Sequence, residues 1–192
     1  MVQNTHRQIN PQHCSKLLTI FTTHLLFIGA SMADSIEKDL KNWFAGKKKV
    51  VLAGIGNPIR QDDEVGVKIV QNLQGKVPEN VRLLECETVP EGYILDIEQF
   101  KPTHVLLIDA AFLGLKPGET RLFETEKIED FPAITTHMLP LKIFCEYVKQ
   151  ATGAKIALLL VEPKCVEFGE GLSVEVEEAA QRIMAMLAGF LS

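Results

Sequence analysis

From residue 49 onward, short apolar runs alternate with amphipathic stretches, and this alternation constrains the fold more than any other feature of the chain. The apolar runs are residues 50–55, 81–86, 104–108 and 156–161. They are almost continuously apolar, which is typical of strands that are buried on both faces. Strands that alternate with helices form a mostly parallel sheet with right-handed crossovers and a helical layer on each side. The pattern therefore predicts an α/β fold.

The stretches between these runs carry apolar residues every three to four positions, as a helix that faces a core does. The predicted helices cover residues 34–44, 65–73, 92–100, 141–148 and 174–191. Ser173 is expected to cap the last helix, whose early glutamates suit the positive end of its dipole. Thr120 to Phe123, after a turn at residues 116–119, is predicted to be an edge strand or hairpin arm.

Composition limits the function classes. A chain of 192 residues with 46% hydrophobic and 23% charged residues is suited to one globular domain. Its net charge of −5 argues against a nucleic-acid partner, which a basic protein would bind better. Its four cysteines, Cys14, Cys86, Cys145 and Cys165, form no CxxC pair, and we interpret them as reduced and cytosolic.

The first 32 residues differ from the rest and are interpreted as an N-terminal extension to a single domain at residues 33–192. Residues 17–30 are mostly apolar and resemble a signal peptide, but they are too few to cross a membrane. A secretion signal, a surface or partner-binding extension, and upstream sequence before a true start at Met32 remain alternatives. We favour the last two because nothing later in the chain requires an extracellular setting. No stable membrane insertion is expected.

Ligand sites on open α/β sheets lie beyond the carboxyl ends of the strands. The first such turn begins with Gly54 and Gly56, which usually mark a tight turn but also suggest a dinucleotide fingerprint. Ile59 stands where that fingerprint requires a small residue, and three acids follow at residues 62–64. There is no P-loop sequence either. A non-catalytic nucleotide or small-ligand binding module that uses the Gly54–Gly56 turn is kept as an alternative function.

Three groups at strand or loop ends could form a metal site. They are one acid of the first turn, Asp109 at the end of the third apolar run, and His137 in a loop. Two carboxylates and one imidazole suit a divalent transition metal. Each group also has an ordinary structural interpretation: acids at a helix start balance its dipole, Asp109 could cap a loop, and a loop histidine is usually solvated. Only the fold could bring the three together.

Three strings in the correct order, GIGNPIRQDDEVG, LLIDAAFLGLKPG and TTHMLPL, resemble the [NiFe] hydrogenase maturation endopeptidases, specifically the HycI branch. The resemblance covers roughly residues 49–190. It implies a cytoplasmic monomer with a three-layer α/β/α sandwich of the phosphorylase/hydrolase-like kind. It also implies that Asp63, Asp109 and His137 bind metal, with Asp62 as the neighbour of the first.

The resemblance further implies an aspartic-type, nickel-dependent endopeptidase that removes a C-terminal extension from the precursor large subunit of a [NiFe] hydrogenase. Nickel would be presented by the precursor, although another divalent metal could occupy the site in the isolated protein. Asp63 and Asp109 are the expected catalytic residues, as bases toward water or as ligands of a Lewis-acid metal. Cys86, Cys145 and Cys165 are expected to be buried structural thiols. A related peptidase or amidase with another substrate is a second alternative.

Overall fold

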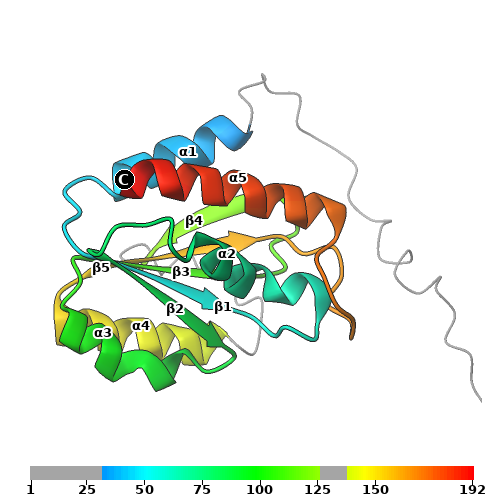
Figure 1. Ribbon diagram of the computed structural model, residues 1–192. Coiled ribbons are helices and arrows are strands. Elements are labelled where there is room, and N and C mark those ends of the chain that lie inside the picture. Colours follow the sequence, from blue (N-terminus) through cyan, green and yellow to red (C-terminus); the bar gives the residue numbers. More distant parts are fainter. Residues whose placement is uncertain (1–31, 126–137) are drawn as a thin grey trace, which may run out of the picture.

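The computed structural model describes residues 32–125 and 138–192 and contains one five-stranded sheet in the order β2-β1-β3-β5-β4. The strands are β1 (Val50–Ile55), β2 (Val81–Glu87), β3 (His104–Ala110), β4 (Thr120–Glu124) and β5 (Lys155–Val161). Neighbouring strands are parallel except β4, which lies antiparallel to β5 at one edge (Figure 1). The mostly parallel sheet and its edge strand are therefore confirmed.

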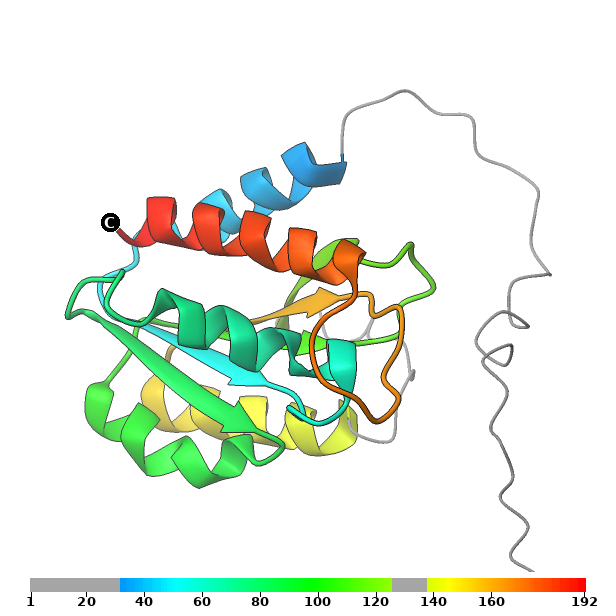
Figure 2. The ribbon, with the colours of Figure 1, turned by 45° about the vertical axis from the view of Figure 1, so that its right-hand side comes forward.

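Helices cover both faces of the sheet. One layer contains α1 (Met32–Trp43), α2 (Val65–Leu73) and α5 (Val174–Leu191), and the other contains α3 (Ile94–Phe100) and α4 (Met138–Thr152) (Figures 1 and 2). Two 3₁₀ helices, η2 (Gln61–Glu64) and η3 (Pro90–Tyr93), precede α2 and α3. The arrangement is the expected three-layer α/β/α sandwich.

Successive residues of each central strand enter opposite cores. Val50 and Leu52 pack in the cluster beneath α1, α2 and α5, whereas Val51 and Ala53 pack in the cluster above α3 and α4. Strand side chains alternate between faces, so a strand covered by helices on both sides must be apolar at every position. This explains why the strands are nearly continuous apolar runs in the sequence.

Most predicted boundaries agree with the structure to within two residues. The largest difference is at the helix predicted for residues 141–148, which extends over Met138–Thr152. Another lies at residues 92–100, where a single helix was predicted. The chain instead forms η3 and then α3, because Pro90 opens a tighter turn first. The N-terminal apolar run at residues 17–30 and His137 lie outside the described residues. Within the part that is described, no helix is long and apolar enough to span a membrane.

Candidate active site

The candidate site lies where the winding of the sheet reverses. Strand β1 has β2 on one side and β3 on the other, so the chain turns in opposite directions after β1 and β2. Ligands of open α/β sheets bind at such a switch point, beyond the carboxyl ends of the two strands. Asp63 follows β1 in η2, and Asp109 is the penultimate residue of β3. The topology therefore brings both predicted acids to the same edge.

Three glycines allow the start of α2 to pack against the sheet. A Cβ atom on Gly66 would lie 2.0 Å from the Ile108 carbonyl oxygen, and one on Gly54 would lie 2.3 Å from that of Gly66. Gly56, at a φ of +137°, faces the Asp63 carbonyl oxygen, 1.7 Å from where its Cβ would be. These close approaches bring η2 against β1 and β3. The glycines of this turn therefore accommodate the protein's own backbone, and the nucleotide-binding alternative stays a prediction.

Asp63 is held by its own turn. Its backbone N–H donates to the Arg60 carbonyl at 3.1 Å, and its Oδ2 accepts from the Asn57 backbone N–H at 3.0 Å. The residue is half-buried, and Oδ1 accepts no hydrogen bond from residues 32–125 or 138–192. One carboxylate oxygen thus fixes the side chain while the other is available to a ligand.

Asp109 lies close enough to Asp63 for the two charges to interact. Burial, and to a lesser extent the charge of Asp63, raise the pKa of Asp109 from 3.8 to about 7, while a hydrogen bond from the Ala110 N–H opposes both effects. That N–H donates to Oδ1 at 2.8 Å. A carboxyl group that titrates near neutrality can both accept and donate a proton under physiological conditions. The catalytic and metal-binding roles of the two acids stay predictions.

The third predicted ligand, His137, lies outside the described residues, and its role remains a prediction. Across residues 32–125 and 138–192, no three His, Cys, Asp or Glu side chains are arranged to hold a metal ion. Asp63 and Asp109 alone supply two carboxylate oxygens, Oδ1 and Oδ2 respectively, that accept no hydrogen bond within those ranges. This donor set suits a divalent cation but requires a further ligand.

Asp62 has a different role from its neighbour, and the sequence did not reveal it. The side chain is completely buried, and it accepts hydrogen bonds from the backbone N–H groups of Lys164, Cys165 and Ser173 at 2.6 to 3.0 Å. The Ser173 hydroxyl also donates to it, at 2.9 Å. Ser173 does occupy the N-cap position of α5, but it makes no side-chain cap hydrogen bond. The predicted capping role was therefore wrong, because the hydroxyl is used by Asp62.

Through these contacts Asp62 joins two distant segments. The connection between β5 and α5 lies alongside the start of α2 (Figure 2). A carboxylate with four donors in a buried setting is a strong, charge-assisted anchor. The only sequence signal for this anchoring role of Asp62 was its position beside Asp63 in a short turn. Two adjacent side chains in such a turn cannot both point to the same side.

Glu162 is a second buried acid that supports the site. It follows β5 directly, and its Oε2 accepts from the backbone N–H groups of Leu113 and Leu115 at 2.6 and 3.1 Å. The segment it holds comes directly after β3 and Asp109. Its position at a strand end was a sequence signal, but its partners could not be predicted.

The structure describes three of the four cysteines, Cys86, Cys145 and Cys165. Cys86 and Cys145 are buried, and burial raises the pKa of each thiol to about 12. Both are the inert structural thiols that were predicted. Cys165 differs from the prediction because it is partly exposed, in the connection that Asp62 holds.

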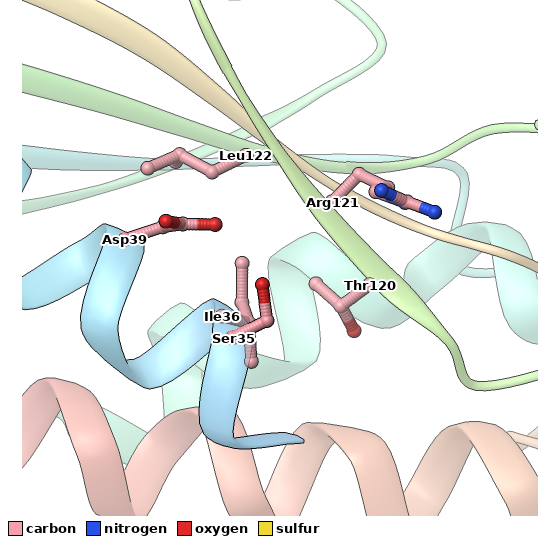
Figure 3. A pocket seen from close by; sticks show the side chains of 6 residues that line it. All are labelled: Ser35, Ile36, Asp39, Thr120, Arg121 and Leu122. Atoms are coloured by element: carbon pink, nitrogen blue, oxygen red, sulfur yellow. The ribbon is translucent and has the colours of Figure 1, made fainter. Parts of the chain in front are cut away.

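A small surface pocket lies between α1 and β4 (Figure 3). Its lining consists of Ser35, Ile36, Asp39, Thr120, Arg121 and Leu122. Neither Asp63 nor Asp109 contributes to it, so it is separate from the candidate site.

The fold and site together define a three-layer α/β/α protein that carries a pair of interacting carboxylates at its switch point. Comparison with known proteins gives the family. The model of the HycI hydrogenase maturation protease family matches residues 67–189, and the chain belongs to this family.

Relatives and solved structures agree with that assignment. The chain is 33% identical over 164 residues to MJ0631 of Methanocaldococcus jannaschii, which carries the name of a hydrogenase maturation protease; the match covers 81% of this chain and 94% of that protein. It is 27% identical to the hydrogenase 3 maturation protease of Escherichia coli, over 73% of this chain and 89% of that protein. The crystal structure of a [NiFe] hydrogenase maturation protease HycI from Thermococcus kodakarensis has a TM-score of 0.74 and 35% identity, over 80% of this chain and 98% of that one.

Proposed function

We propose that this chain is an endopeptidase that removes a C-terminal extension from the precursor large subunit of a [NiFe] hydrogenase after nickel has been inserted. Membership of the maturation protease family supports the reaction class. The observation that carries the proposal is the pairing of Asp63 with Asp109, whose pKa is raised to about 7 by burial and by the charge of Asp63. Such a pair can serve peptide hydrolysis at neutral pH.

Nickel belongs to the substrate in this proposal. The precursor presents the metal, and Asp63, Asp109 and the imidazole of His137 recognise it. Oxygen and imidazole ligands suit nickel, and the free oxygens of the two acids support this role. Recognition of the metal positions the scissile peptide only in loaded precursors, and positioning supplies a large part of a hydrolytic rate. In the isolated protein, another divalent cation takes the same ligands.

The chemical step needs a base and a proton donor. A water oxygen attacks the scissile carbonyl carbon, a carboxylate takes the water proton, and that proton passes to the leaving nitrogen as the peptide bond breaks. Asp109 is suited to this transfer because its pKa of about 7 lets it hold and release a proton at neutral pH. Asp63 keeps the pair negatively charged and orients it. The precursor's metal can add Lewis-acid polarisation of the carbonyl.

The partners follow from this proposal. The enzyme acts in the cytoplasm as a monomer that docks transiently on the precursor, without nucleic acid or stable membrane insertion. Residues 1–32 are proposed to be an extension that the reaction does not need.

Mass spectrometry of a large-subunit precursor, with and without nickel, tests the proposal directly. We expect this protein to release one C-terminal peptide from the nickel-loaded precursor and none from the nickel-free form. His137→Ala should abolish release, and undiminished release by that variant would remove the histidine from the proposed ligand set. In a thermal-shift assay, stabilisation by ATP or NAD but not by Ni²⁺ would favour ligand binding over proteolysis.

A further inference from the structure

Three exposed apolar side chains lie in the connections that follow the strands at the edge of the acid pair. Ile59, Phe112 and Phe168 follow β1, β3 and β5 respectively, and are 58%, 47% and 69% exposed. All three strands are parallel, so these connections leave the sheet at the edge where Asp63 and Asp109 lie. Large apolar groups that remain in water beside a site are characteristic of a docking surface.

The most exposed of these residues is packed on a cation. The guanidinium carbon of Arg60 lies 4.5 Å from the ring centroid of Phe168, and Arg60 Nη1 donates to the Val166 carbonyl at 3.1 Å. Within residues 32–125 and 138–192, no carboxylate bonds this guanidinium. Its other N–H donors therefore remain available to an outside partner.

The backbone beneath these residues is fixed. The Gln61 N–H donates to the Gly169 carbonyl, and the Gly169 N–H donates to the Ile59 carbonyl, each at 3.1 Å. Asp62 anchors the preceding residues of the same connection with its buried carboxylate. Exposed side chains on such a backbone lose less entropy on binding than those on a loose loop.

The same residues are directly continuous with the site. The Arg60 carbonyl accepts from the Asp63 backbone N–H, so the turn that carries the guanidinium also orients the acid. We name Ile59, Arg60 and Phe168 the docking platform. The docking platform therefore lies on the turn that carries Asp63 and on the connection that is hydrogen-bonded to this turn.

We propose that the docking platform binds the precursor polypeptide next to its scissile bond, with the Phe168 ring and Ile59 against an apolar side chain and the Arg60 guanidinium against a carboxylate. This inference rests on the proposed function, because it takes the precursor as the occupant. Aromatic and arginine side chains dominate the binding energy of protein interfaces, and Arg suits carboxylates through its planar fork of donors.

The test uses the full chain and the nickel-loaded precursor, with Phe168→Ala and Arg60→Gln as variants. The matched controls are Leu95→Ala and Ile143→Ala, whose side chains are 68% and 60% exposed on α3 and α4. We expect each platform variant to raise KM for cleavage about tenfold and to change kcat less than about threefold, since the acid pair is unchanged. The control variants should match the wild type.

Two further measurements keep the inference separate from the proposed function. The Kd of Asp63→Asn protein for the precursor is measured with and without the platform substitutions, so docking is assessed even if no cleavage occurs. The loss caused by Arg60→Gln should shrink in high salt, whereas that caused by Phe168→Ala should persist. Unchanged Kd and KM in both platform variants would overturn the inference. It would also be overturned if the platform substitutions weakened association between two copies of this protein and left binding of the precursor unchanged.

Discussion

Asp62 accepts two hydrogen bonds from Ser173, one from its backbone N–H at 2.6 Å and one from its hydroxyl at 2.9 Å. The residues are 111 positions apart. Through this contact the first residue of the acidic turn fixes the start of α5, while the charge of the next residue, Asp63, acts on Asp109. The Asp62 carboxylate thus has a structural role, whereas its neighbour Asp63 belongs to the candidate site.

Removing the Asp62 carboxylate should destabilise the protein and weaken its activity. Asp62→Ala leaves the backbone N–H groups of Lys164, Cys165 and Ser173 without their acceptor in a buried setting. We expect the free energy of unfolding in urea to fall by about 3 kcal/mol or more. The exposed Asp39 of α1 provides the control, because Asp39→Ala should change stability by less than about 0.5 kcal/mol. Equal effects of the two substitutions would contradict the anchoring role.

Neutralising either member of the acid pair should remove most of the activity without unfolding the protein. Asp63→Asn and Asp109→Asn keep the size of the side chain but lose the charge and the proton acceptor. We expect kcat for cleavage of nickel-loaded precursor to fall by about 10² to 10⁴, with far-ultraviolet circular dichroism unchanged. Asp39→Asn serves as the matched control. Full activity in either site variant would show that this acid does not take part in the reaction.

The raised pKa of Asp109 should make stability depend on pH. The folded value is about 7 against an ordinary value of 3.8, so the folded state holds a proton that the unfolded chain has already lost between these values. The stabilisation is therefore complete below about pH 4 and disappears as the pH rises through about 7. The free energy of unfolding is measured for the wild type and for Asp109→Asn in buffer that contains a chelator. The wild-type value minus the variant value should fall by roughly 2 to 4 kcal/mol from pH 5 to 9.

The matching variant for this pH dependence is Asp63→Asn. It removes the second cause of the shift and leaves the first, burial, in place. We expect a smaller pH dependence that does not vanish. A wild-type protein whose stability relative to Asp109→Asn is flat across this range would contradict the environment described for Asp109.

A methyl group at Gly66 should displace α2 from the sheet. Its Cβ would meet the carbonyl oxygens of Ile108 and Ile55 at 2.0 and 2.4 Å, and backbone atoms cannot turn aside as a flexible side chain can. Gly66→Ala should therefore cost about 2 to 3 kcal/mol of stability and lower kcat by moving Asp63. By contrast, Gly189→Ala in α5 meets nothing within 4 Å and should stabilise slightly. The midpoint of thermal unfolding is measured for both variants. An equal midpoint for Gly66→Ala and the wild type would contradict the close packing at Gly66.

Alkylation should distinguish the cysteines of the described residues. Burial raises the pKa of the Cys86 and Cys145 thiols to about 12, so neither forms a thiolate at pH 8. Cys165 is partly exposed and should react first with iodoacetamide in the native protein. Peptide mass mapping after brief labelling provides the measurement. Rapid modification of Cys86 or Cys145 in folded protein would show that the buried environment opens readily.

The architecture could be predicted from the sequence because strands that are buried on both faces consist of continuous apolar residues. Strand β1 spans residues 50–55 as expected, since every side chain of a doubly covered strand is apolar. The rule that parallel strands share a carboxyl edge also predicted that Asp63 and Asp109 lie at one edge of the sheet, as the topology shows.

The supporting contacts could not be predicted in the same way. Asp62 and Glu162 act through backbone N–H groups of remote segments, and no local pattern encodes such partners. Ser173 has the residue type and position of a helix cap, yet a stronger acceptor takes its hydroxyl. The Gly54–Gly56 turn resembled a ligand cradle, whereas its glycines accommodate the protein's own backbone.

The bond between Asp62 and Ser173 also has a consequence for biogenesis. During synthesis Asp62 precedes its partner Ser173 by 111 residues. A nascent chain that ends after β3 already contains Asp63 and Asp109, but the connection that bears Phe168 is not yet held by Asp62. The edge of the sheet that carries the two acids is therefore complete only after residue 173 has been synthesised.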